Sequence, residues 1–458
     1  MKNENYYCDI AENPCSMCMP MGAIIPFKGI EEGMVLLHGS QGCSTYMRRH
    51  IAEHFNEPID VGSSSLNEKG TIYGGEKNLF QAIDNIIKIY KPKILGVLTT
   101  CLAETIGEDV ENMVKKYLKN NPEIDLNIVP VATPGYGGNH PEGYFLALRK
   151  IVEKLSEPGE KTEKINIILP NISPADIREL KRLLNLMEVE YNLLPDISET
   201  LDRPYEKNYM KIAKGGTRIA DIKDMGSAKA TIQMGITVEQ QLSPGQYLED
   251  EFGVPLFNLP IPIGVDNTDL FIKTITKITG KECPQCLKLE RGRLIDAMID
   301  SHKYNFQCRP VIFGEPEFVY AISKTCYENG MFPVVISTGS KSNKLVELLL
   351  KLNNQGSIVK PEIYTQADFV KIRIASKNAN ANLAIGHSDG RYLTEREGIP
   401  LVRRGFPIHD RVGGQRLLSV GYVGTNVLLD QITNTLLEVK QTNYRSTMKS
   451  LYGKTGSN

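Results

Sequence analysis

Short, continuous apolar runs recur along the chain, and most of them lead through a small or polar loop into a stretch with helical periodicity. The clearest runs span residues 35–37, 94–98, 126–129, 165–169, 191–194, 311–313, 333–337 and 383–385. Continuous rather than alternating apolar runs are typical of strands that are buried on both faces of a parallel sheet. The repeated order of strand, loop and helix predicts an α/β fold.

Capping residues mark several predicted helices. Ser173 followed by Pro174 predicts a helix start, and Gly330 predicts a helix end. We also expect a helix over residues 44–55 and a single helix from Cys101 to about residue 118.

The strand and helix pattern divides the chain into three α/β units. The first covers residues 1–160, the second 161–305 and the third 306–435, and residues 436–458 are polar and basic and are expected to form a surface tail.

Composition narrows the classes of function. The 458 residues include 53 Lys and Arg against 54 Asp and Glu, so nothing favours a nucleic-acid or anionic membrane partner. No apolar run approaches the roughly 18 residues that a spanning helix needs, and the first residues lack a signal region, so we expect a cytoplasmic protein. Nine cysteines in such a chain favour reduced thiols or metal ligands over disulfides.

Three cysteine-containing stretches carry the candidate chemistry. Cys43 ends the small-residue loop 38–43, Cys101 follows a predicted buried strand, and Cys18 belongs to the Cys15-Ser16-Met17-Cys18 stretch. A thiolate near a helix start is favoured by the unpaired N–H groups there, and thiolates are the usual ligands of iron–sulfur clusters. The pattern favours a soft-metal site, with buried structural cysteines as the alternative.

In this order and at these spacings, the three stretches resemble the nitrogenase component 1 family, and in particular its β-type subunits. The resemblance runs through at least six motifs from residue 13 to about 435 and implies three Rossmann-like α/β units with parallel sheets. It implies that Cys18, Cys43 and Cys101 bind an iron–sulfur cluster, of [4Fe-4S] or [8Fe-7S] P-cluster type, shared with an α-type partner. Cys15 has no counterpart that we can place.

The resemblance also implies an α2β2 heterotetramer with a NifE- or NifD-like α-type subunit and a NifH-like iron protein as electron donor. Residues 198–202, the pair at 413–414 and Asn139 favour a NifN-type scaffold for iron–molybdenum cofactor assembly. The alternative is a NifK-like catalytic β chain of nitrogenase or of a nitrogenase-like reductase, which relays electrons through a P-cluster, and the complete set of three cysteines favours it. NifK chains carry serines at two positions where this chain has Gly135 and Asn139. We name no catalytic residues, since in the family the ligands of the catalytic cofactor belong to the α-type subunit.

A second metal site is implied by the same resemblance. Asp296 and Asp300 share one helix face, and with Glu57 they match residues that hold a divalent cation at the contact between two β-type subunits. Asn56 replaces the more usual arginine beside Glu57, and a solvated acidic face is the equal alternative.

Two further motifs have competing interpretations. His50 and His54 lie one helical turn apart, which suits either zinc or simple packing. Cys283 and Cys286 form a Cys-x-x-Cys motif that could be a redox pair, could join Cys15 and Cys18 in a four-cysteine zinc site, or could be two thiols at a helix start. A zinc-stabilised nucleotide-binding protein is the alternative from a different class of function.

Overall fold

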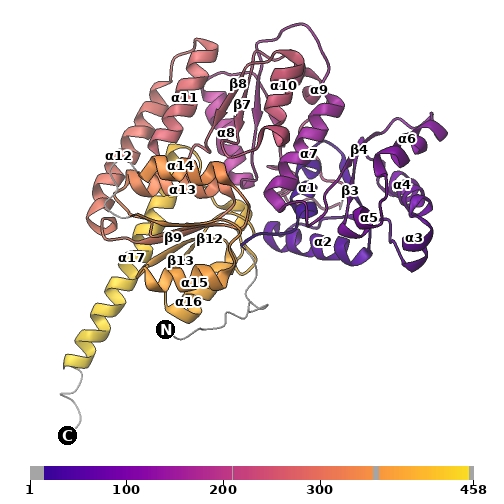
Figure 1. The fold of residues 1–458 in the computed structure, drawn as a ribbon. Helices are drawn as coiled ribbons and strands as arrows, with labels where there is room; N and C mark the ends of the chain where they lie inside the picture. Colours follow the sequence, from indigo (N-terminus) through magenta and orange to yellow (C-terminus); the bar gives the residue numbers. More distant parts are fainter. Residues whose placement is uncertain (1–14, 209, 354–359, 453–458) are drawn as a thin grey trace.

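The strands of the chain form three separate parallel sheets, as Figure 1 shows. The structure is a computed structural model and describes residues 15–208, 210–353 and 360–452. Two sheets have four strands and one has five, and all strand pairs within the described residues are parallel. The predicted α/β fold with parallel sheets is therefore confirmed.

The first sheet has the strand order β2-β1-β3-β4. Its strands are β1 (Gly33–His38), β2 (Gly62–Ser63), β3 (Ile94–Thr99) and β4 (Asn127–Val131). Its helices are α1 (Met19–Lys28), α2 (Gln41–Phe55), α3 (Glu68–Tyr73), α4 (Glu76–Tyr90), α5 (Cys101–Thr105), α6 (Val110–Asn120) and α7 (His140–Leu155). Every residue of β1 and β3 is buried, in agreement with their continuous apolar sequences.

The second sheet has the order β6-β5-β7-β8. Its strands are β5 (Ile165–Ile168), β6 (Tyr191–Leu194), β7 (Ala230–Met234) and β8 (Leu256–Leu259). Its helices are α8 (Pro174–Leu186), α9 (Ile219–Lys223), α10 (Pro244–Phe252), α11 (Val265–Thr279) and α12 (Gln285–Asn305), with short 3₁₀ turns at Asp224–Ser227 and Gln240–Leu242. The Ser173 side chain accepts a hydrogen bond from the Asp176 N–H, as the predicted cap requires.

The third sheet has the order β11-β10-β9-β12-β13. Its strands are β9 (Pro310–Gly314), β10 (Val335–Thr338), β11 (Glu362–Tyr364), β12 (Leu383–Gly386) and β13 (Leu401–Arg403). Its helices are α13 (Pro316–Glu328), α14 (Asn343–Asn353), α15 (Phe369–Asn378), α16 (Arg391–Glu397) and α17 (Gly421–Tyr452), with 3₁₀ turns η3 (Ser388–Gly390) and η4 (Gly414–Arg416).

Helix α1 is almost wholly buried and crosses α7 at very close range. A Cβ added to Gly22 would lie 1.7 Å from the His140 carbonyl oxygen, and one added to Gly143 would lie 2.0 Å from the Met19 carbonyl oxygen. Only glycine leaves room for such an approach of two backbones. This crossing fixes the start of α1, where Cys18 stands, against the start of α7.

The three sheets share one continuous hydrophobic core. One cluster of buried side chains includes members from all three sheets, such as Leu37, Ile167 and Ile336. Units that share a core hold one another in place, so the loops at their boundaries are fixed as well.

Two local expectations differ from the structure. The helix expected from Cys101 to about residue 118 is instead two helices, because Gly107 adopts a φ of +79° and the Asp109 side chain caps α6 by accepting from Asn112 N–H. Residues 436–452, expected as a tail, continue α17, which extends away from the body (Figure 1). Among the described residues, no helix is both long and apolar enough to cross a membrane.

Candidate functional site: three thiols at helix starts

Two of the predicted cluster cysteines leave the first sheet at the same edge. Strands β1 and β3 are parallel neighbours, with His38 opposite Thr99. Cys43 follows β1 in the first turn of α2, and Cys101 follows β3 as the first residue of α5. Because the carboxyl ends of parallel strands meet at one edge, both thiols arrive together.

A glycine allows the two loops to approach each other. A Cβ on Gly39 would lie 1.9 Å from Thr100 Oγ1, so a larger residue would separate the loop before α2 from the loop before α5. The loop is also held by Ser64, whose hydroxyl accepts from the Gly39 N–H at 3.0 Å.

Cys18 reaches the same place from the amino-terminal segment. It is the N-cap residue of α1 and forms a backbone bridge with Asn139. The preceding residue, Met17, donates its N–H to His140 Nδ1 at 3.1 Å, and its carbonyl accepts from the His140 N–H at 2.9 Å. The segment is therefore pinned to the start of α7 on both sides of its backbone.

Gly135, in the loop after β4, forms a cradle for two of the thiols. A Cβ at this position would lie 3.0 Å from Cys18 Sγ and 3.2 Å from Cys101 Sγ. The Gly135 N–H donates to Cys101 Sγ at 3.1 Å. The structure thus brings Cys18 and Cys101 to one spot and supplies a backbone donor for sulfur.

Cys43 lies close enough to Cys18 and Cys101 for the charges of the thiolates to interact. Burial first, and then the charges of Cys101 and Cys43, raise the pKa of Cys18. Burial and then the charge of Cys101 raise the pKa of Cys43. All three thiols are free, and Cys18 and Cys101 are exposed while Cys43 is half-buried. Three sulfurs that repel one another's negative charge need a cationic group between them to be thiolates together.

The donor set fits a cluster of several iron atoms better than a single ion. In the part of the chain that the structure describes, no three Cys, His, Asp or Glu side chains converge as one metal ion requires. Three neighbouring thiols, two of them exposed and in contact range of one glycine, are a donor set that suits an iron–sulfur group.

A cavity of about 360 Å³ lies beside Cys18. Its walls come from the amino-terminal segment, α2, the loop after β4 and the third unit, and include Tyr46, His50, Asn139, Asp389 and His409. Sequence reasoning missed Asp389 and His409 as site residues because they lie more than 330 residues beyond α2, and no local spacing connects them.

The two histidines of α2 do not form a zinc site within the described residues. His54 is buried, and its Nδ1 accepts from the Ile408 N–H at 2.8 Å. Burial lowers the pKa of His54 to about 3. His50 is half-buried, and its Nδ1 lies 3.8 Å from Glu53 Oε2. Packing is therefore the interpretation that the structure favours for His54.

The residues of the expected cation site do not meet within one chain. Asp296 and Asp300 are exposed on α12. Glu57 follows α2 and accepts from the Arg203 N–H at 3.1 Å and from Arg203 Nε at 2.9 Å. Its carboxylate is already paired, so a cation shared between two chains stays a prediction.

The Cys-x-x-Cys motif lies at a helix start. Cys283 and Cys286 are free and flank Pro284, the N-cap of α12. Cys15 is buried against the third sheet, so it is not placed to share a zinc ion with exposed Cys18.

The fold and the site together define a class: a three-unit α/β protein with parallel sheets that gathers cysteine thiols at the carboxyl edge of its first sheet. The family model for nitrogenase component 1 type oxidoreductases matches residues 18–437. A nitrogenase molybdenum-iron protein beta chain of Methanococcus maripaludis is 38% identical over 441 residues, which cover 93% of this chain and 94% of that protein. The chain belongs to the nitrogenase component 1 family and is a homologue of its beta chains.

Other relatives and a solved structure agree with this assignment. The molybdenum-iron protein beta chain of Clostridium pasteurianum is 37% identical, with 93% of each chain covered. The vanadium-iron protein beta chain of Trichormus variabilis is 34% identical, again with 93% of each covered. A structure titled "Nitrogenase Cp1 at pH 6.5" superposes with a TM-score of 0.89 at 36% identity, covering 93% of each chain.

Proposed function

We propose that this chain is the β-type subunit of a nitrogenase-like reductase and supplies Cys18, Cys43 and Cys101 to an iron–sulfur cluster shared with an α-type subunit. The placement of Cys18 and Cys101 against Gly135, with Cys43 close enough for its charge to act on Cys18, carries this proposal. The relatives named as beta chains of molybdenum-iron and vanadium-iron proteins support it.

The chain's own residues would hold the cluster and stabilise negative charge on its sulfurs. Cys18, Cys43 and Cys101 would each provide one thiolate, and the Gly135 N–H would donate to Cys101 Sγ. Because burial and mutual repulsion raise the pKa of Cys18 and of Cys43, binding must displace their protons. The bound cluster would supply electron transfer, with a potential set by ligation, hydrogen bonds and burial.

The partners follow from the same proposal. The exposed side of the thiol group would be covered by a NifD-like α-type subunit in an α2β2 heterotetramer, and a NifH-like iron protein would deliver electrons. Glu57 of one β-type subunit with Asp296 and Asp300 of another would hold a divalent cation at the β–β contact.

A NifN-type assembly scaffold is the second candidate. In NifK chains a serine in this region can ligate the oxidised P-cluster, and here neither Gly135 nor Asn139 offers a hydroxyl. The Asn139 side chain is instead engaged with Ser16 Oγ at 3.2 Å and with the Gly339 carbonyl at 2.9 Å. A scaffold that holds a cofactor precursor does not need an additional redox-dependent ligand.

Composition analysis of the assembled complex separates the two candidates. The chain is co-expressed with its α-type partner and purified without oxygen, and iron, molybdenum and the Mössbauer spectrum are measured. An eight-iron bridging cluster with a molybdenum-containing cofactor supports the reductase. A four-iron bridging cluster without mature cofactor supports the scaffold, and a complex without iron contradicts both.

The ligand assignment has its own test. We expect Cys43→Ala to lose bridging iron, while Cys286→Ala, which removes an exposed thiol at the start of α12, keeps it. Full iron in Cys43→Ala would refute the assignment of that ligand.

A further inference from the structure

Cys15, His387, Asp389 and His409 form a row of ionisable groups beside the thiol site, with neighbouring polar atoms 3.5–3.7 Å apart, and the proposed cluster does not use them. Cys15 Sγ lies 3.5 Å from His387 Nε2. His387 Nδ1 lies 3.7 Å from Asp389 Oδ2, and His409 Nε2 lies 3.7 Å from Asp389 Oδ1. One carboxylate thus stands between two imidazoles.

The exposure of these groups decreases from the cavity inwards. The side chain of His409 is 18% exposed and lines the cavity that also contains Cys18. Asp389 is 7% and His387 4% exposed, and Cys15 is fully enclosed. His409 therefore lies at the solvent-accessible end of this row of residues, beside the cavity, and Cys15 lies at the buried end, against the third sheet.

Cys15 determines the tautomer of His387, the buried imidazole beside Asp389. A thiol has one S–H to give, and burial raises the pKa of Cys15, so Cys15 stays protonated and donates to His387 Nε2. The imidazole proton of neutral His387 then sits on Nδ1 and faces Asp389. Burial also lowers the pKa of His387 to about 4, so this ring stays neutral near pH 7. Cys15 and His387 are positioning residues for Asp389.

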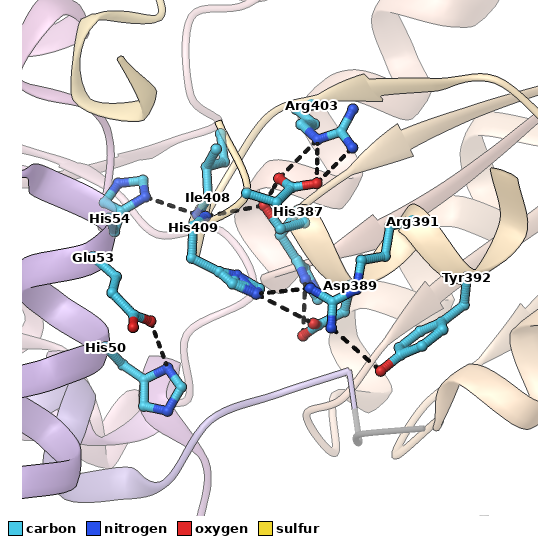
Figure 2. A network of polar contacts seen from close by, with 12 residues as sticks. His50, Glu53, His54, His387, Asp389, Arg391, Tyr392, Arg403, Ile408 and His409 are labelled. Atoms are coloured by element: carbon cyan, nitrogen blue, oxygen red, sulfur yellow. Dashed lines mark hydrogen bonds and ion pairs between the residues drawn. The ribbon is translucent and has the colours of Figure 1, made fainter. Parts of the chain in front are cut away.

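His409, at the solvent-accessible end, has a ring nitrogen that can accept a proton. Arg391 has only donors, so its contact of 3.4 Å with His409 Nε2 makes that nitrogen an acceptor. A proton added at Nε2 would give an imidazolium 3.7 Å from Asp389 Oδ1. The Arg391 guanidinium can remain with Tyr392 Oη, 3.4 Å from its other nitrogen. Figure 2 shows Asp389, Arg391 and His409 facing one another, with His50 across from them on α2.

Other ionisable groups surround His409. Cys18 and Tyr46 line the same cavity as His409, and the other ionisable groups around it are His50, Glu53 and His54 of α2, His387 after β12, Asp389 of η3 and Arg391 of α16. His54 and His387 are held neutral by burial, and His50 has a lowered pKa for the same reason. His50 and His409 both line the cavity and both lie beside a carboxylate, and His409 is the one whose carboxylate, Asp389, also contacts the buried His387.

We propose that the His409–Asp389 pair exchanges one proton with solvent in step with the oxidation state of the cluster held at Cys18. This inference rests on the proposed function. The pair takes up one proton from solvent when the site receives one electron from a reduced iron–sulfur donor protein, and it releases that proton when the electron leaves. The total charge of this enclosed region then stays constant, which lowers the electrostatic cost of each electron transfer.

The test is the pH dependence of the midpoint potential of the bridging cluster, followed by electron paramagnetic resonance in the purified complex. In the unmodified complex we expect the potential to fall as the pH rises, by at most about 59 mV for each tenfold fall in proton concentration. His409→Gln should flatten this slope, because the amide keeps polar contacts but takes up no proton. His302→Gln, at an exposed histidine of α12, is the matched control and should keep the slope.

Iron content, measured on the same samples, separates this inference from the proposed function. A complex with full bridging iron and the same slope in His409→Gln as in the unmodified protein overturns the inference alone, as does a flat potential in the unmodified protein. An unmodified complex without bridging iron contradicts the proposed function instead.

A second measurement needs no variant. Redox-difference infrared spectra of the unmodified complex with ¹³C-labelled histidine should contain an imidazole protonation band that shifts with the label. The lack of any label-sensitive band would overturn the inference even if His409→Gln fails to assemble.

Discussion

Replacing Gly135 by alanine tests whether the cradle around the thiols controls cluster binding. The added methyl would lie 3.0 Å from Cys18 Sγ and 3.2 Å from Cys101 Sγ. Contacts this short force the sulfurs to move by a few tenths of an ångström. The φ of Gly135 is not in the left-handed region, so alanine strains no backbone torsion there, and the substitution isolates the contact with sulfur.

The size of the effect follows from the cost of overpacking. Extra methyl groups in packed sites cost about 1–3 kcal/mol. Gly135 is only half-buried, which favours the lower part of that range, about 1–2 kcal/mol, or a factor of about 5–30 in an equilibrium constant. Because the sulfurs must occupy fixed positions only when metal is bound, we expect the loss to fall mainly on cluster retention.

The assay is competition with a ferrous chelator under anaerobic conditions. We expect Gly135→Ala to lose bridging iron at a chelator concentration about 5–30 times lower than the unmodified complex does. Gly292→Ala is the control, since a Cβ there meets nothing within 4 Å and the position lies inside α12. Equal iron retention in Gly135→Ala and Gly292→Ala would refute the argument that this glycine shapes the site.

Four further predictions concern stability and assembly. His54→Leu leaves the buried Ile408 N–H without its acceptor, so we expect a loss of about 1–3 kcal/mol, seen as a lower thermal midpoint of the complex; an unchanged midpoint would contradict it. Burial lowers the pKa of His54 from 6.5 to about 3, so its contribution to stability is complete above pH 6.5 and is lost as the pH falls toward 3. Acid unfolding monitored by circular dichroism should therefore depend less on pH in His54→Leu. Burial raises the pKa of Glu317 from 4.5 to about 7, so its contribution is present below pH 4.5 and is lost as the pH rises through about 7; Glu317→Gln should reduce that loss in denaturant titrations between pH 5 and 8, and an identical pH profile would count against it. Exchanging both Asp296 and Asp300 for Asn should weaken β–β association in analytical ultracentrifugation if the shared cation exists, and an unchanged assembly state would reject the site.

The predicted strands were recognisable because a strand buried on both faces has a continuous apolar sequence. Residues 94–98 are apolar without alternation, and the structure buries all of β3. The placement of Cys43 and Cys101 at helix starts followed from the same pattern, since loops after parallel strands collect at one edge of the sheet.

Helix α1 was missed because it lacks the signals that identify a helix. It is buried on almost every side, so its sequence shows no apolar stripe, and it contains Pro20 and Pro26. Gly22 does reflect its packing, since its small size permits the crossing with α7. A single glycine indicates a helix crossing only once the partner helix is known.

The cavity residues could not be predicted for a different reason. Asp389 and His409 meet His50 through tertiary packing between the first and third units, and the residues between them carry no spacing rule. Sequence motifs identify ligands that lie in one loop, whereas a site assembled by three units depends on how the units dock.

Cys15 and Cys18 show how docking of the units gives two similar residues opposite roles. The Cys15 N–H donates to the Ala367 carbonyl at 3.0 Å, and a Cβ on Gly339 would lie 2.2 Å from the Cys15 carbonyl oxygen, so the third unit closes directly over this residue. Three residues later the chain enters α1, and Cys18 is left exposed beside Gly135 of the first unit. The short segment between them therefore spans the boundary between the two units. Because one thiol is buried with His387 and the other is presented at the surface, the position of the third unit relative to the first controls both the thiol site and the histidine–aspartate chain next to it.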